Sequence, residues 1–104
     1  MIRFARAGDR PAIAAVVERA FGQPDEAELV ARLRESGDVM FELVAAQDGE
    51  VAGHLMFSRL WADSQNLYAA LAPVAVAPER QRTGVGSALI RASFAQAQPS
   101  PRKT

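Results

Sequence analysis

The stretch LAPVAVAPERQRTGVGSALIRASFAQA, residues 71–97, passes from a strand-like pattern through a turn to a helix-like pattern. Its small apolar residues extend a run that begins at residue 67 and predict a strand over 67–77. Its last part has apolar residues at helical spacing and predicts a helix over about 87–96. Between them, Gly84 and Gly86 predict a turn whose backbone N–H groups, at a helix start, can hold an anion such as a phosphate.

The two glycines allow three interpretations. A nucleotide-binding P-loop requires GxxxxGK[ST], and no Lys-Ser or Lys-Thr follows here. A dinucleotide fingerprint requires a third glycine, but Leu89 occupies that position. The third interpretation is a plain strand–helix turn in which the glycines serve packing. The glycine spacing alone leaves this plain turn open beside a phosphate-binding turn.

The segments before this stretch predict a hairpin. Asp48-Gly49 separates two apolar-rich runs, and this pair is a strong hairpin signal between strands at 41–47 and 50–58. Pro73 lies inside the strand predicted over 67–77, where it removes a ladder hydrogen bond. That strand is therefore expected to contain a bulge or to lie at the edge of a sheet.

The N-terminal part predicts one more strand and two helices. Residues 2–6 alternate apolar and basic side chains, which favours a strand. Helical spacing predicts a helix over about 10–21 with Asp9 as its N-cap, and Asp25 with Glu28 predicts a capping box at a second helix. The expected fold class is α/β (α+β): a mostly antiparallel sheet of about four strands with flanking helices, in the order β-α-α-β-β-β-α.

The composition excludes several classes of function. Twelve basic and twelve acidic residues give a formal net charge of zero, which argues against a nucleic-acid partner. The chain has no cysteine and His54 is its only histidine, so no metal is expected. No apolar run suits a membrane span or a signal peptide, so we expect a cytoplasmic protein without a membrane partner. Residues 1–97 are expected to form one domain and 98–104 a disordered tail.

The whole string from Val74 to Ile90, VAVAPERQRTGVGSALI, resembles motif A of the GNAT superfamily of acyl-CoA N-acyltransferases. That motif is a strand ending in V-x-V, then [QR]-x-x-G-x-[GA], then a helix. The hairpin segment GHLMF (53–57) and the opening IRFARAGDRPAIAAVVERAF are also similar to this family. The resemblance covers roughly residues 1–97 and favours a phosphate-binding turn over a plain one.

The resemblance implies an N-acetyltransferase that transfers an acetyl group from acetyl-CoA to an amine by direct attack. The backbone N–H of Val74 would meet the thioester carbonyl and stabilise the developing oxyanion. Ala75 and Val76 would line the pantetheine, with Val76 pairing in a strand-like manner. The pyrophosphate would lie on a cradle formed by Gln81, Arg82, Thr83, Gly84, Val85, Gly86 and Ser87.

Such a reaction needs a group that takes a proton from the amine. Glu42 on the hairpin and His54 are the available candidates. Each also has a purely structural interpretation, as a solvated strand end for Glu42 and as a hydrogen-bonded strand histidine for His54. The acceptor is expected to be a small-molecule or peptide amine, and the sequence does not identify it.

The chain departs from the family pattern after residue 97. The family's fifth strand, which completes the pantetheine slot, and the tyrosine that protonates the departing thiolate do not follow. Strand 71–77 is then a sheet edge, which predicts a homodimer through it. Two functions stay open: an N-acetyltransferase completed by dimerisation, or a truncated, catalytically inactive remnant that binds CoA weakly or serves as an interaction module.

Overall fold

Four strands form one sheet in the order of the chain. They are β1 (Ile2–Phe4), β2 (Val39–Gln47), β3 (Glu50–Trp61) and β4 (Leu67–Val76), and each pairs antiparallel with the next. The computed structural model describes residues 1–37, 39–61 and 67–97. The predicted hairpin is confirmed: Asp48 and Gly49 join β2 to β3 with φ angles of 52° and 78°, the positive values that a two-residue hairpin turn favours.

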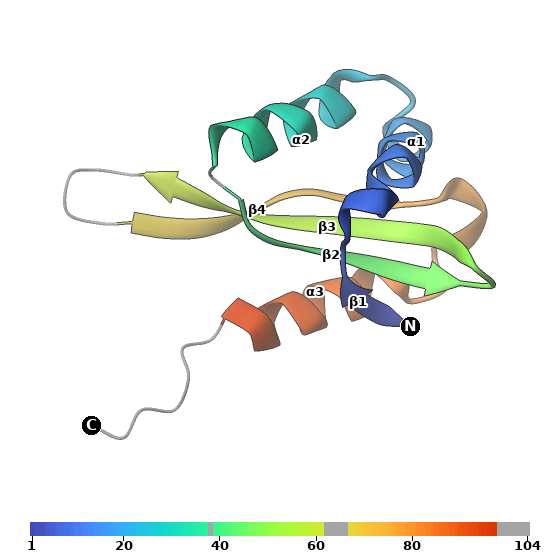
Figure 1. Ribbon diagram of the computed structural model, residues 1–104. Coiled ribbons are helices and arrows are strands. Elements are labelled where there is room, and N and C mark those ends of the chain that lie inside the picture. Colours follow the sequence, from blue (N-terminus) through green and yellow to red (C-terminus); the bar gives the residue numbers. More distant parts are fainter. Residues whose placement is uncertain (38, 62–66, 98–104) are drawn as a thin grey trace.

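The helices cover both faces of this sheet. α1 (Arg10–Phe21) and α2 (Asp25–Ser36) lie on one face, and α3 (Val85–Ala97) lies on the other (Figure 1). Two 3-10 turns, η1 (Ala7–Asp9) and η2 (Pro78–Arg80), lead towards α1 and α3. The predicted fold class and order of elements are confirmed. The stretch 71–97 begins in a strand and ends in a helix, as the sequence indicates.

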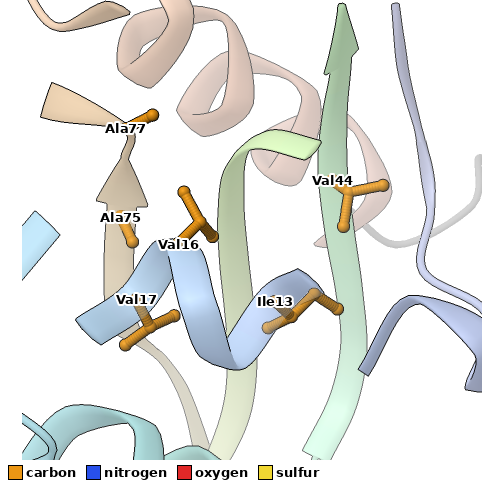
Figure 2. Close-up of a cluster of buried hydrophobic side chains, with 6 residues drawn as sticks. All are labelled: Ile13, Val16, Val17, Val44, Ala75 and Ala77. Carbon is orange, nitrogen blue, oxygen red and sulfur yellow. The ribbon is translucent and has the colours of Figure 1, made fainter. Parts of the chain in front are cut away.

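The core under α1 follows from the helical spacing of its apolar residues. Ile13, Val16 and Val17 are almost completely buried, and Figure 2 shows them against Val44 of β2 and Ala75 of β4. Each buried side chain of this size contributes roughly 1.5–3 kcal/mol. Because α1 packs across strands that are distant in sequence, it fixes β4 relative to β2.

The core under α3 depends on one glycine. Val85 and Leu89 of α3 pack on apolar side chains of β2 and β3, including Leu55. A Cβ atom added to Gly53 would lie 3.0 Å from Val85 Cγ1 and 3.1 Å from Leu89 Cδ1. Gly53 therefore lets the first turn of α3 approach β3 closely, and this contact places the helix start beside β4.

The predicted irregularity at Pro73 is confirmed. Leu55 of β3 pairs with Val74, whereas the next residue, Met56, pairs with Ala72, so β4 has an extra residue at Pro73. β4 is also an edge of the sheet within the residues that the structure describes. A proline is tolerated at such a position because the ladder is already interrupted there.

The predicted N-cap position of α1 is confirmed, whereas the capping box predicted for the second helix is wrong. Asp9 occupies the N-cap position of α1 but makes no capping hydrogen bond, because its carboxylate accepts from Arg3 Nη1 (2.8 Å), Arg3 Nη2 (3.1 Å) and the Arg6 backbone N–H (2.8 Å). The capping box at Asp25 is absent, since Asp25 is the first helical residue and Pro24 holds the cap position without a side-chain bond.

Several element ends also differ from the prediction. β1 ends at Phe4 rather than at residue 6, β3 continues to Trp61, and α3 begins at Val85, two residues early. The tail predicted over 98–104 lies outside the described residues.

Candidate functional site

The turn before α3 has an unusual backbone. Arg82 has φ of 67° and Gly84 has φ of 91°, both in the left-handed region. Such a conformation is uncommon for a residue other than glycine. Thr83 Oγ1 donates to the Arg80 carbonyl (2.5 Å), which ties the turn to the end of η2. The turn is thus held in a conformation that an arginine adopts at an energetic cost, a feature that is frequent at functional sites.

The first backbone N–H groups of α3 have no acceptor within the helix. The earliest helical bond runs from the Ala88 N–H to the Gly84 carbonyl (2.9 Å), so the N–H groups of Val85, Gly86 and Ser87 precede the ladder. The helix dipole adds partial positive charge at the same place. The turn residues 81–84 are exposed, as is Ser87. This end of α3 can therefore hold an anion.

Arg82 adds a full positive charge to the turn. Its side chain is exposed and forms no hydrogen bond or ion pair within residues 1–37, 39–61 and 67–97. The neighbouring Arg80, in contrast, is held by Gln47 and lies 3.8 Å from Asp48 Oδ2. Of these two arginines, only Arg82 is left to pair with a ligand.

The edge of β4 presents backbone groups beside this turn. The Ala77 N–H donates to the Ala52 carbonyl of β3 (2.8 Å), so alternate residues of β4 face β3. By the same alternation, Val76 and Val74 direct their N–H and C=O groups to the free edge. Gln81 Nε2 donates to the Val76 carbonyl from that side (3.1 Å), which agrees with this orientation. The N–H groups of Val74 and Val76 are therefore available for another extended backbone or amide.

The third residue of this segment is oriented differently. Ala75 is completely buried and packs against α1 (Figure 2). Its backbone faces β3, where it pairs with His54. Val74 and Val76, but not Ala75, thus offer polar groups to the free edge.

Glu42 and His54, the two candidate bases, contact each other on the face covered by α1 and α2. Their separation is 2.9 Å between His54 Nε2 and Glu42 Oε1. Arg34 of α2 binds the same carboxylate through both oxygens, with Nε–Oε2 at 2.8 Å and Nη2–Oε1 at 2.9 Å. Burial raises the pKa of Glu42, but the hydrogen bonds from Arg34 and His54 outweigh it and hold the pKa at about 2. Glu42 is therefore ionised at neutral pH.

His54 is completely buried, and its Nδ1 atom has no hydrogen-bond partner among the described residues. Because an ionised carboxylate can only accept, we assign the Nε2 proton to the bond with Glu42. In the neutral ring Nδ1 is then the unprotonated nitrogen. If His54 were only a hydrogen-bonded strand histidine, this role would explain the bond between Nε2 and Glu42 but would leave Nδ1 unexplained.

The sequence did not indicate Arg34. It lies eight residues before Glu42, in a helix that the sequence predicts to flank the sheet, and its contact with Glu42 depends on how α2 packs on β2. A local motif carries no such signal.

The part of the chain that the structure describes holds neither a metal-binding cluster nor a membrane-spanning helix. No three His, Cys, Asp or Glu side chains lie together in a way that suits a metal ion. No helix there has the length and apolar character needed to cross a bilayer.

Comparison with known proteins identifies the family. Residues 10–100 match the model of the acetyltransferase (GNAT) family. The uncharacterized N-acetyltransferase YjhQ of Escherichia coli is 42% identical over 88 residues, which are 80% of this chain and 49% of that protein. YhbS of the same species is 36% identical and matched over 50% of its length. The chain thus spans about half the length of these curated relatives.

Solved structures agree. A GNAT family acetyltransferase from Brucella melitensis, in complex with acetyl-CoA, matches with a TM-score of 0.86 and 38% identity, over 92% of this chain and 66% of that one. Escherichia coli YhbS in complex with CoA matches with a TM-score of 0.83 and 31% identity, over 92% of this chain and 54% of that one. Sequence and fold therefore lead to one conclusion: the chain belongs to the acetyltransferase (GNAT) family.

Proposed function

We propose that this chain binds acetyl-CoA along the edge of β4 and on the turn at residues 81–87, and transfers the acetyl group to an amine. One observation carries the proposal: within the described residues, the N–H groups of Val74 and Val76 lie on a sheet edge without a strand partner, and η2 connects this edge to a helix-start turn in which Arg82 forms no ion pair. The Brucella relative that holds acetyl-CoA supports it. The comparisons do not favour an inactive remnant over this function.

The turn suits a pyrophosphate in charge, and its residues 81–84 and 87 are exposed to a ligand. The N–H groups of Val85, Gly86 and Ser87 would donate to its oxygens, and the Arg82 guanidinium would pair with its charge. Gln81 and Thr83 would hold the backbone of the turn through their own hydrogen bonds. Gly84 supplies the left-handed conformation, and the missing side chain of Gly86 leaves the backbone open to the ligand.

The edge of β4 fits the extended part of the molecule. The Val76 N–H would pair with a pantetheine amide in the manner of an added strand. The Val74 N–H, next to the bulge at Pro73, would donate to the acyl carbonyl oxygen and stabilise negative charge there. When bound, the cosubstrate supplies an acyl group activated as a thioester. Ala75 would contribute by fixing this segment in the core.

Of the two candidate bases, we propose that His54 takes the proton and Glu42 orients it. Arg34 holds the Glu42 carboxylate with a low pKa, which makes it a weak base, while its bond to Nε2 leaves Nδ1 as the basic nitrogen. Because the ring has no exposed surface, the proton would reach it through water. In a His54→Gln variant the rate of amine acetylation should fall by about 10²-fold or more while acetyl-CoA binding is kept, whereas loss of a purely structural histidine in a variant that still folds would leave the rate unchanged.

We also propose an acceptor class and a surface for self-association. The acceptor is a small-molecule or peptide amine, and β4 is the surface through which two copies would form a homodimer. A cytoplasmic location and the lack of a nucleic-acid partner stay predictions from composition.

Release of free thiol from acetyl-CoA tests the activity. The purified chain would be incubated with acetyl-CoA and, separately, with a polyamine, an amino-acid amide and a peptide with a free N-terminus. Thiol release that depends on one of these amines, together with a product heavier by one acetyl group, is expected. Thiol release without any acetylated amine would contradict the proposal, because simple hydrolysis would then explain it.

A further inference from the structure

A pocket lies away from the turn, among η1, α1, α2 and β2. It has a volume of about 190 Å³, and its charged lining consists of Arg6, Arg10, Arg34 and Glu42. Three guanidinium groups against one carboxylate leave an excess of positive charge. We call this site the arginine pocket.

The three arginines of the arginine pocket are not equivalent. Arg34 is fixed, because Nε and Nη2 are both bonded to Glu42, and its Nη1 has no partner among the described residues. Arg6 and Arg10 are exposed, and neither forms an ion pair within the described part of the chain. One rigid donor thus lies at the wall, with two unpaired cations that can close over a ligand.

The rest of the arginine pocket is apolar. Ala5, Ala7, Ile13 and Val39 complete most of its lining. Its volume is below the range of about 300–1,000 Å³ that is usual for drug-sized ligands, so the occupant must be small. A concave site with one sign of charge in excess and apolar walls concentrates anions that carry a short hydrocarbon part.

We propose that the arginine pocket binds a small carboxylate with a short apolar chain. Guanidinium groups match carboxylates in geometry and bind them with charge-assisted hydrogen bonds. The apolar part of the lining favours a carboxylate with a hydrocarbon chain over inorganic phosphate, which has no apolar part to bury there. None of its lining residues belongs to β4 or to the turn, so the pocket is separate from the proposed acetyl-CoA site, but it shares Arg34 and Glu42 with the cluster around the proposed base.

Titration with butyrate, followed by amide NMR signals of the full chain, tests the proposal. Saturable shifts are expected at Ala5, Ala7 and Val39. Arg6→Gln and Arg10→Gln should each weaken binding about tenfold, the usual loss for one charge-assisted hydrogen bond. Arg91→Gln is the matched control, because it removes one exposed arginine from α3, on the opposite face of the sheet (Figure 1).

The controls distinguish specific binding of a carboxylate in the arginine pocket from non-specific attraction of anions to surface arginines. Unchanged unfolding temperatures of the variants would show that they fold normally. Absence of saturation with butyrate, an equal loss in Arg91→Gln, or tighter binding of inorganic phosphate at the same amides would overturn the proposal. Butylammonium should not bind. Binding of butyrate by a chain that fails to bind acetyl-CoA would leave this proposal intact, so the two can fail separately.

Discussion

Gly84 and Gly86 play different parts in the turn although the sequence presents them as one motif. Gly84 has φ of 91°, and a Cβ atom there would meet no atom within 4 Å, so conformation alone requires glycine. At Gly86 φ does not lie in the left-handed region, and an added Cβ would make an ordinary contact of 3.5 Å with Val76 Cγ2. Stability therefore requires glycine at position 84. At position 86 glycine instead leaves the backbone open to a ligand.

Unfolding by denaturant separates these two roles. Gly84→Ala should lose about 1–2 kcal/mol, because alanine is strained at this φ. Gly86→Ala should be neutral or gain up to about 1 kcal/mol, since alanine is the better helix former. Equal losses in the two variants would contradict the distinction.

The ion pair at Glu42 makes stability depend on pH. Its pKa in the folded chain is about 2, below the usual value of 4.5, so the stabilisation is fully present above pH 4.5 and is lost as the pH falls towards 2. The shift corresponds to roughly 3 kcal/mol. In Glu42→Gln this pH-dependent part is absent, and the difference in unfolding free energy between the two proteins should shrink as the pH falls.

Asp9 provides the internal check for that experiment. Its hydrogen bonds with Arg3 and with the Arg6 backbone lower its pKa to about 2 as well, so both proteins should still lose stability in acid. A difference between wild type and Glu42→Gln that stays constant from neutral pH to pH 3 would mean that Glu42 titrates normally.

At the scale of the elements, the contact between β3 and α3 positions the turn. A Cβ atom added to Gly53 would lie only 3.0 Å from Val85 Cγ1 and 3.1 Å from Leu89 Cδ1. We expect Gly53→Ala to lose about 1–3 kcal/mol, the usual cost of overpacking a core. Gly8→Ala is the matched control, because nothing lies within 4 Å of its added Cβ. Chemical denaturation of both variants measures the difference, and a neutral Gly53→Ala would show that α3 can shift freely.

The sequence predicted those elements whose signals are local. The hairpin at Asp48-Gly49 and the irregularity at Pro73 each follow from residues with restricted or unusual backbone preferences. Polar side chains were less predictable. Asp9 is a good cap by type, but Arg3 of β1 competes for its carboxylate.

The candidate site likewise has one part that the sequence could predict and one part that it could not. Its turn and strand edge are contiguous in sequence, so a motif could indicate them. The Arg34–Glu42–His54 cluster joins α2, β2 and β3, and it exists only because α2 packs on this face of the sheet. Neither Arg34 nor the arginine pocket could therefore be predicted from spacing.

At the scale of the whole molecule, β4 decides how the chain interacts. Within the described residues it forms an edge whose Val74 and Val76 N–H groups have no strand partner. An unpaired edge is a template for another strand. The proposed homodimer would use it, and so would the proposed binding of pantetheine, which means that the two should compete.

Sedimentation equilibrium combined with hydrogen exchange tests this competition. The chain should associate as its concentration rises, with slower exchange at the Val74 and Val76 amides, and acetyl-CoA should shift it towards monomer. The Ala77 amide, which is already bonded to Ala52, should not change. A chain that stays monomeric, or that associates with Val74 and Val76 still exchanging freely, would rule out this edge as the interface.

The most direct test of the acetyl-CoA site is a calorimetric titration of the folded chain with acetyl-CoA. We predict saturable binding that is roughly tenfold weaker in Arg82→Gln and in Gly86→Ala, unchanged in Arg91→Gln, and much weaker for pantetheine, which lacks the pyrophosphate. Absence of binding by the folded chain, or equal affinity in all three variants, would contradict the assignment of the turn as the pyrophosphate site.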